Sequence, residues 1–141
     1  MTNLSTSSED FLPMQEAFHN AFFYFLKALH VMSLNQADQL AEMNHANAAW
    51  EIQHDVLDQG AALIDWTPGM LQLPENEAIR GFLRLVETMP TSALSSGDQA
   101  MRHSAWIEVR TGAKKLLVQL EDARARNHEY FETQKPVDSQ S

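Results

Sequence analysis

Three Glu-x-x-His pairs are the residues whose types and spacing come closest to metal chemistry in this chain. They are Glu16 with His19, Glu42 with His45, and Glu51 with His54. In helical di-iron proteins, such a pair places a carboxylate and an imidazole one turn apart on a surface that faces the core, and facing helices supply further glutamates. Here Glu16 falls nearly opposite the apolar stripe that His19 flanks, and only His54 falls on an apolar seam. We therefore predict no metal site and no cofactor, and we keep a metal-binding helical bundle as the third function class.

Other catalytic chemistry lacks the residues that it needs. The chain has no cysteine, which excludes disulfides, thiolate metal sites and cysteine nucleophiles. It has no glycine-rich phosphate loop, no Gly-x-Ser-x-Gly turn and no His-Glu-x-x-His motif, and nothing in the sequence places two carboxylates in one pocket. The sequence predicts a protein that binds and does not catalyse.

The elements that would position these residues are helices. Between Pro13 and Gly60 the chain runs 46 residues without glycine or proline, and apolar residues recur there at alternating steps of four and three, as in a long amphipathic helix. The seam begins with Met14, Phe18, Ala21, Phe25, Ala28 and Met32. After a four-residue stutter to Gln36 it continues through Leu40, Met43, Asn47, Trp50, His54, Leu57, Ala61 and Ile64. A second apolar side runs through Leu34, Ala41, Ala48, Ile52, Val56 and Leu63. We predict an all-α fold of long amphipathic helices, in an elongated molecule or a four-helix bundle, with coiled-coil-like packing.

A break inside this stretch is the main alternative. Ser33, with Gln36 three positions later, matches a capping box that would start a second helix. The join has no glycine or proline, and the apolar phase survives it with only the stutter, which coiled coils permit. The pattern favours one long or gently kinked helix over residues 13–64, and a hairpin that turns at Ser33 is the other reading.

The remaining boundaries follow turn and capping signals. Pro68-Gly69 marks a turn, Pro74 suits the start of a short helix over residues 75–89, and Ser96 or Asp98 caps the last helix. The predicted core positions are Phe11, Met14, Phe18, Phe22, Phe25, Leu29 and Met32, then Ile79, Phe82, Leu83, Val86 and Met89, then Trp106, Val109, Ala113, Leu116, Leu120, Ala123, Asn127 and Phe131. Gly112 sits inside the last helix, where it either costs about 1 kcal/mol or allows a close helix crossing. Residues 10–132 are predicted to form a single helical domain, between disordered tails at residues 1–9 and 133–141 that cannot bury enough apolar surface to become ordered.

Charge is divided unevenly along the chain. Residues 1–79 hold eleven acidic side chains against one base, Lys27, and carry −10, whereas residues 80–141 carry +1. The acidic half repels phosphate backbones, so we predict no nucleic-acid partner. The most apolar run is shorter than the ~20 residues that a bilayer requires, and the N-terminus lacks the basic region of a signal peptide. We expect no transmembrane segment and a cytoplasmic protein.

Two groups of residues are candidates for contacts. Trp66, Met70, Leu71 and Leu73 are bulky apolar groups on a turn, which either cap the helical core or form a patch for a partner. Trp50, Ile52, His54 and Asn47 lie on the two seams, where a second copy would cover them and the polar members would set the pairing. Because one chain cannot cover both seams of a continuous helix, we predict a homo-oligomer, most simply a dimer. The acidic half of one copy would lie near Arg102, Arg110, Lys114 or Arg124 of the other.

These features favour a non-enzymatic helical protein–protein interaction module: an adaptor, a chaperone-like protein, or an acidic antagonist of a partner with a basic or apolar surface. The alternative function is an amphipathic coat on an apolar particle. In its cysteine-free helical layout with alanine and glutamine, the chain is loosely similar to the phasins of polyester storage granules. That resemblance implies a protein that coats a surface.

Overall fold

The described part of the chain folds into helices joined by short turns. The computed structural model describes residues 3–43, 47–64, 71–96 and 98–133, and of residues 3–14 and Asp98 it describes the backbone only. Over these ranges the elements are α1 (Asn3–Ser33), α2 (Gln36–Glu42), α3 (Ala48–Ile64), α4 (Leu73–Glu87), the short 3-10 helices η1 (Thr91–Ala93) and η2 (Asp98–Arg102), α5 (Ser104–Gln119) and α6 (Glu121–Thr133), with no strand. The predicted all-α class is confirmed. No helix in these ranges is long and apolar enough to cross a bilayer.

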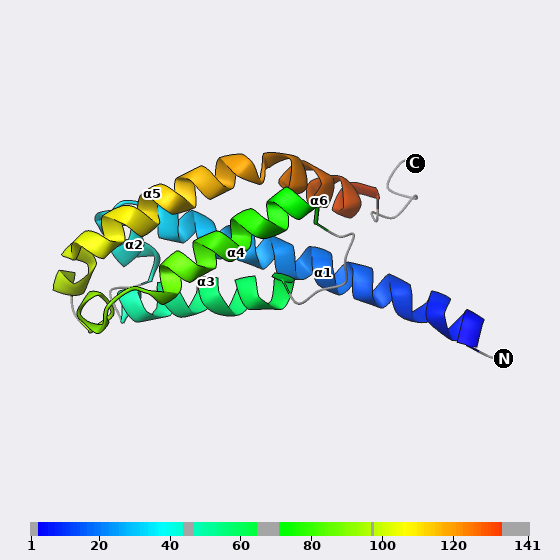
Figure 1. Ribbon diagram of the computed structural model, residues 1–141, viewed down its shortest axis with the longest axis horizontal. Helices are drawn as coiled ribbons and strands as arrows, with labels where there is room; N and C mark the ends of the chain where they lie inside the picture. Colours follow the sequence, from blue (N-terminus) through cyan, green and yellow to red (C-terminus); the bar gives the residue numbers. More distant parts are fainter. Residues whose placement is uncertain (1–2, 44–46, 65–70, 97, 134–141) are drawn as a thin grey trace.

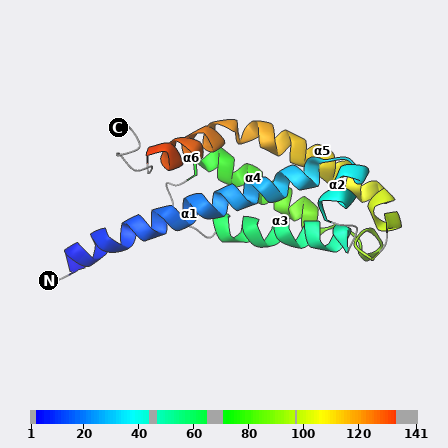
Figure 2. The ribbon, with the colours of Figure 1, turned by 180° about the vertical axis from the view of Figure 1, so that it is seen from behind.

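The longest helix, α1, supplies one wall of the core. Its buried residues Phe18, Phe22, Phe25, Leu29 and Met32 recur at steps of four and three, as predicted. The side chains of Phe11 and Met14, also predicted in this stripe, lie outside the described part. This stripe packs against α3 and α5. The N-terminal end of α1 projects beyond the other helices (Figures 1 and 2). The helix includes residues 3–9, where we expected a tail; extending a helix that is already formed adds one hydrogen bond per residue ordered.

The continuous helix predicted over residues 13–64 is wrong, because the chain turns after Ser33. The Ser33 hydroxyl donates to the His30 carbonyl at 2.6 Å, and α1 ends there. The cap of α2 is Asn35, whose side chain accepts from the backbone N–H of Asp38 at 2.9 Å. The Asn35 side chain thus takes the place of a backbone carbonyl as the acceptor at the start of α2. After this turn, α3 returns along α1 (Figure 2). The stutter in the apolar pattern marks this break.

One of the two apolar sides predicted for α3 faces the core. Ile52, Val56 and Leu63 are buried between α1 and α4. The other side is covered only in part: Leu57 and Ile64 pack half-buried against the core, whereas Trp50 is 49% exposed. Asn47, predicted on a helical seam, instead precedes α3 as an exposed residue with φ of 25°, and its carbonyl accepts from Glu51. This is a left-handed conformation that asparagine tolerates better than most residues. The premise that a second copy must cover both seams is therefore wrong.

Two glycines let helices approach closely around α4. A Cβ atom added to Gly60 would lie 2.6 Å from Leu83, and one added to Gly112 would lie 3.0 Å from the Phe82 ring. Of the two readings of Gly112, the close crossing is confirmed, since the Phe82 ring of α4 lies against it and α4 packs on α5. The predicted core residues of α4, together with Met89, are all buried. Leu73–Glu87 starts two residues before the predicted helix, with a capping box between Gln72 and Glu75.

The last predicted helix is divided in two. Its seam from Trp106 to Asn127 is buried as predicted, whereas Phe131, also predicted in the core, is only half-buried. The helix itself is interrupted, because α5 ends before Leu120 and α6 starts at Glu121. The cap of α5 is His103, whose Nδ1 accepts from the Ala105 N–H at 3.0 Å, in place of the predicted Ser96 or Asp98. The Trp106 indole donates to the Ala93 carbonyl at 2.8 Å. This bond holds η1 against the base of α5.

Candidate docking groove

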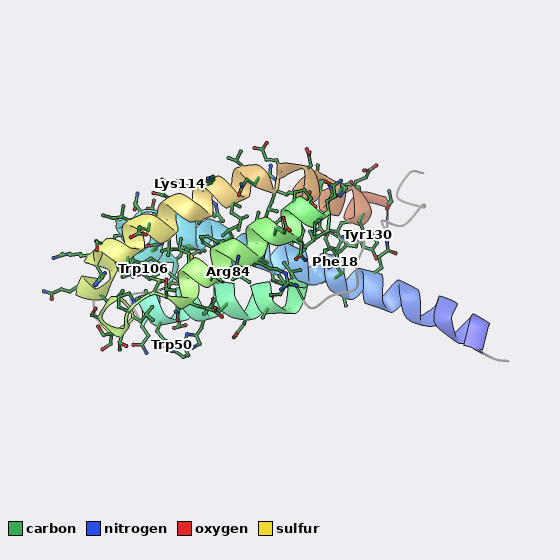
Figure 3. All side chains as sticks on the ribbon, in the orientation of Figure 1. Phe18, Trp50, Arg84, Trp106, Lys114 and Tyr130 are labelled. Atoms are coloured by element: carbon green, nitrogen blue, oxygen red, sulfur yellow. The ribbon has the colours of Figure 1, made fainter. Side chains whose placement is uncertain are left out.

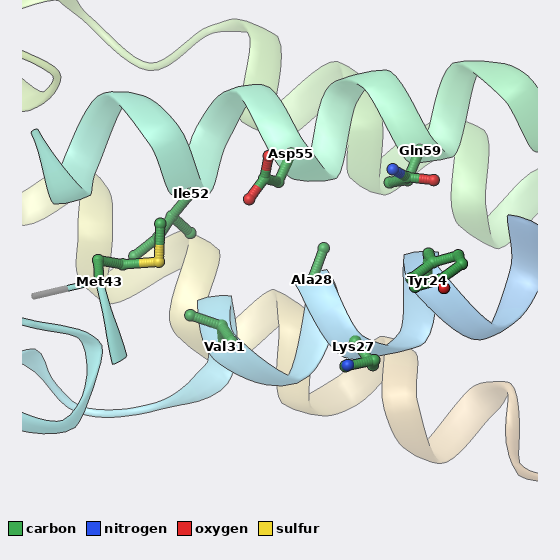
Figure 4. Close-up of a pocket in the computed structure, with 8 residues that line it drawn as sticks. All are labelled: Tyr24, Lys27, Ala28, Val31, Met43, Ile52, Asp55 and Gln59. Carbon is green, nitrogen blue, oxygen red and sulfur yellow. The ribbon is translucent and has the colours of Figure 1, made fainter. Parts of the chain in front are cut away.

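A shallow groove of about 240 Å³ lies between α1 and α3. It is lined by Tyr24, Lys27, Ala28 and Val31 of α1, by Met43 after α2, and by Ile52, Asp55 and Gln59 of α3. Figure 4 shows Asp55 and Gln59 extending from α3 towards α1, with Ala28 on the facing side. The groove is smaller than the pockets of about 300–1,000 Å³ that enclose small molecules. It is too small to enclose a drug-sized molecule.

An acidic row runs along α3 at the edge of this groove, and Asp55 is the member of the row that lines it. Glu51, Asp55 and Asp58 follow one another at spacings of four and three, so they lie along one side of the helix. Burial raises the pKa of Asp55 above its ordinary value of 3.8, and the negative charges of Glu51 and Asp58 raise it further, while His54 acts in the opposite direction. Among the described residues, none of the three carboxylates forms a salt bridge. The row is therefore a concentration of negative charge beside an apolar floor.

Opposite the acidic row, Lys27 lies with two aromatic rings. Its ammonium is 5.5 Å from the Phe23 ring centre and 5.9 Å from that of Tyr24. Both rings are largely exposed, at 45% and 53%. The only base of the acidic first half is thus held by cation–π contacts on its own helix. The groove has an aromatic side on α1 and an acidic side on α3.

A different arrangement, the polar junction, joins α1, α2, α5 and η2. It consists of Gln39, Arg110 and the backbone carbonyls that they contact. Gln39 is fully buried, and its Nε2 donates to the carbonyls of Val31 and Met32 at 3.1 and 2.9 Å. Its Oε1 accepts from Arg110 Nε and Nη2 at 3.0 and 2.8 Å, and Nη2 also donates to the Met101 carbonyl. Gln39 therefore satisfies carbonyls that the end of α1 leaves open, and the junction is structural.

The Glu-x-x-His pairs do not form a metal site in the described part of the chain, where no group of three His, Asp or Glu side chains could hold an ion. Glu16 is exposed, whereas the His19 ring hydrogen-bonds Asn127 and stacks on Tyr130 with ring centres 3.9 Å apart. His54 stacks on Trp50 at 3.6 Å. His45 lies outside the described residues. The first of these histidines ties α6 to α1, and the second lies beside the acidic row.

A second hollow of about 210 Å³, between the end of α4 and the start of α5, has two of its polar side chains engaged in capping the helices. The Thr88 hydroxyl donates to the Leu85 carbonyl, and His103 caps α5. We therefore place the candidate site in the first groove.

The predicted contact residues are not gathered in one place. Trp66 and Met70 lie outside the described residues. Leu71 packs partly buried against the core, whereas Leu73 is 70% exposed at the start of α4. Of the seam candidates, Ile52 lines both the core and the groove, Trp50 and His54 lie on the neighbouring side of α3, and Asn47 precedes it.

The sequence did not predict four residues that line the groove: Tyr24, Lys27, Asp55 and Gln59. Two signals pointed to them. Lys27 is the only base among residues 1–79, and the three acids of α3 have helical spacing. Neither signal shows that the two helices lie side by side, because that requires the turn at Ser33.

No protein-family model, curated protein or solved structure matches this chain.

Proposed function

We propose that the protein is a non-enzymatic helical interaction module, adaptor-like in its action, which receives an amphipathic helix of a partner in the groove between α1 and α3. The observation that carries this proposal is the acidic row beside an apolar floor, in which like charges crowd Asp55. A partner that brings positive charge relieves this crowding. Its apolar side chains cover Ala28, Val31 and Met43, which are only partly buried in the chain alone.

The spacing of the acidic row suits a helical partner. Glu51 to Asp58 spans two turns, or about 10 Å at 1.5 Å per residue. Lysine or arginine at similar spacing on a partner helix can reach all three carboxylates, while apolar residues between them enter the groove. Docking of an amphipathic helix in a groove is a common recognition mode, in which apolar anchors at helical spacing supply most of the contact. This chemistry specifies a partner helix that is both basic and apolar.

The rest of the fold supports the groove as a rigid frame. In this proposal α1, α3, α4 and α5 form a four-helix bundle, because consecutive members of the ring α1, α3, α4, α5 pack on one another and α5 closes it against α1. The side chains behind the groove, Phe25, Leu29 and Val56, are fully buried. Binding then requires little rearrangement of the helices.

A synthetic peptide that carries leucine and lysine at helical spacing tests the proposal. We expect it to shift the amide NMR signals of Ala28, Asp55 and Gln59, and to bind less tightly as salt rises from about 0.05 to 0.5 M. Asp55→Lys should weaken the peptide at least about tenfold, because it places a positive charge in the acidic row. Glu77→Lys makes the same charge change on an exposed residue of α4 and should leave binding unchanged.

Two results would contradict the proposal. If the peptide shifts signals elsewhere, or if both variants bind it equally, the groove is not the docking site. If the protein instead covers oil droplets with no dependence on salt or on Asp55→Lys, the coat function is favoured. Thermal unfolding of each variant checks that the fold is retained.

A further inference from the structure

The outer side of α5 carries an apolar and basic stripe. Ile107 and Val118 are 63% and 65% exposed, the largest exposed fractions among the bulky apolar residues of this helix. Thr111 and Lys114 lie between them at helical spacing on the same side, and Lys115 flanks the stripe. All three are exposed. The opposite side of α5 is buried in the core, so the stripe is a separate surface of the helix.

This stripe has the chemistry that the groove requires. Its length from Ile107 to Val118 is about 16 Å, against about 10 Å for the acidic row, and its two lysines lie between its apolar ends. Two other bases of the second half are held inside the chain: Arg110 by Gln39, and Arg126 by Glu75 at 2.6 Å. Lys114 and Lys115 form no salt bridge with any described residue. They are the bases best placed to meet a second set of carboxylates.

The groove and the stripe of one chain cannot meet. Among the four long helices, α1 contacts both α3 and α5, and α4 also contacts both, so α1 and α4 lie between α3 and α5. Figure 3 shows Lys114 on the side of α5 away from α3. The stripe therefore reaches a groove only in another copy.

We infer that the occupant of the groove is the α5 stripe of a second copy of this chain, so that the protein assembles head to tail. This inference rests on the proposed function and specifies the partner. The complementary charges of the two surfaces carry it: Lys114 and Lys115 of one copy face the Glu51, Asp55 and Asp58 row of the next, and Ile107 or Val118 enters the apolar floor. Each contact uses the groove of one copy and the stripe of another, so an assembly that does not close has a free groove at one end and a free stripe at the other. Such contacts produce rings if they close, or open chains.

Sedimentation equilibrium of the full chain at about 0.05 M salt tests the assembly, because low salt preserves attraction between exposed charges. We expect a mass that rises with concentration above that of one chain. Asp55→Lys removes the groove and keeps the stripe, whereas Lys114→Glu with Lys115→Glu removes the stripe and keeps the groove. Each variant alone should be monomeric. Their equimolar mixture should form a one-to-one pair that grows no further, since one intact groove meets one intact stripe.

Arg84→Glu, an exposed charge reversal on α4, is the matched control and should assemble like the parent. Ile107→Ser with Val118→Ser tests the apolar part at positions where folding does not depend on burial, and should weaken association at least about tenfold. A parent that is monomeric at all concentrations overturns the inference, as does a mixture that fails to pair, or a groove or stripe variant that assembles normally on its own. If the parent is monomeric but the leucine–lysine peptide binds the groove, the proposed function stands and only the second copy is excluded as its partner. If neither occurs, both proposals fail.

Discussion

The polar junction and the acidic row both place polar side chains next to the core, but they differ in how those groups are paired. In the polar junction, buried Gln39 uses both ends of its amide, and Arg110 donates to it twice. In the acidic row, three carboxylates lie along one helix with no salt bridge to any described residue. Paired polar groups inside a protein specify the packing of its helices. Crowded like charges at a rim raise the free energy of the isolated chain and favour a partner of opposite charge.

The largest effect on stability should come from breaking the polar junction. Arg110→Met leaves Gln39 Oε1 and the Met101 carbonyl without their donors, and unpaired buried acceptors cost about 1–3 kcal/mol each. We expect urea unfolding to show a loss of about 3 kcal/mol. The control is Lys115→Met, an exposed base on the same helix, which should change stability by less than about 0.5 kcal/mol. Equal effects of the two variants would mean that the junction does not stabilise the fold.

An intermediate effect is expected at Gln53, which is buried on α3 and donates from Nε2 to the Val86 carbonyl at 3.2 Å. Gln53→Met keeps a side chain of similar length but removes this donor from the end of α4. We expect a loss of about 1 kcal/mol by urea unfolding. Gln59→Met, on the groove side of α3, is the control and should be nearly neutral. If Gln53→Met loses as much unfolding free energy as Arg110→Met, a single hydrogen bond stabilises the fold as much as the whole polar junction, and the distinction between them is wrong.

The smallest effect should have the opposite sign and depend on pH. The pKa of Asp55 is raised above 3.8, first by burial and then by Glu51 and Asp58, so the folded chain holds this proton more tightly than the unfolded chain. Ionised Asp55 therefore destabilises the fold above its folded pKa, and this penalty disappears as pH falls below 3.8. Asp55→Asn should stabilise the protein by about 0.5 kcal/mol at neutral pH.

Thermal unfolding of Asp55→Asn and the parent across pH checks this sign, and their difference should vanish at about pH 3. Glu77→Gln on α4 is the matched control. Glu51→Gln removes one of the like charges, so NMR titration should show a lower pKa for the Asp55 carboxyl than in the parent. A stabilisation that persists in acid would show that charge crowding is not its cause.

Apolar spacing predicted the buried faces of α1, α4 and the last two helices because helical periodicity is a local property of the chain. It failed on α3, where two apolar sides were available and only the positions of α1 and α4 decided that Ile52 is covered and Trp50 is not. It also failed at Ser33. A capping signal there competed with a surviving apolar phase, and Asn35 proved to be the cap.

The candidate site shows the same division. The chain alone was enough to indicate a cysteine-free, all-helical protein with an acidic first half, because composition and helical periodicity need no knowledge of neighbours. The groove needed the packing of the helices, since Tyr24 and Asp55 are 31 positions apart and line one surface only when α3 turns back along α1. The hydrogen bonds of Gln39 also depend on helix packing, because Arg110 lies 71 positions later in the sequence, on α5. Contacts of this range depend on the whole core, and no local pattern encodes them.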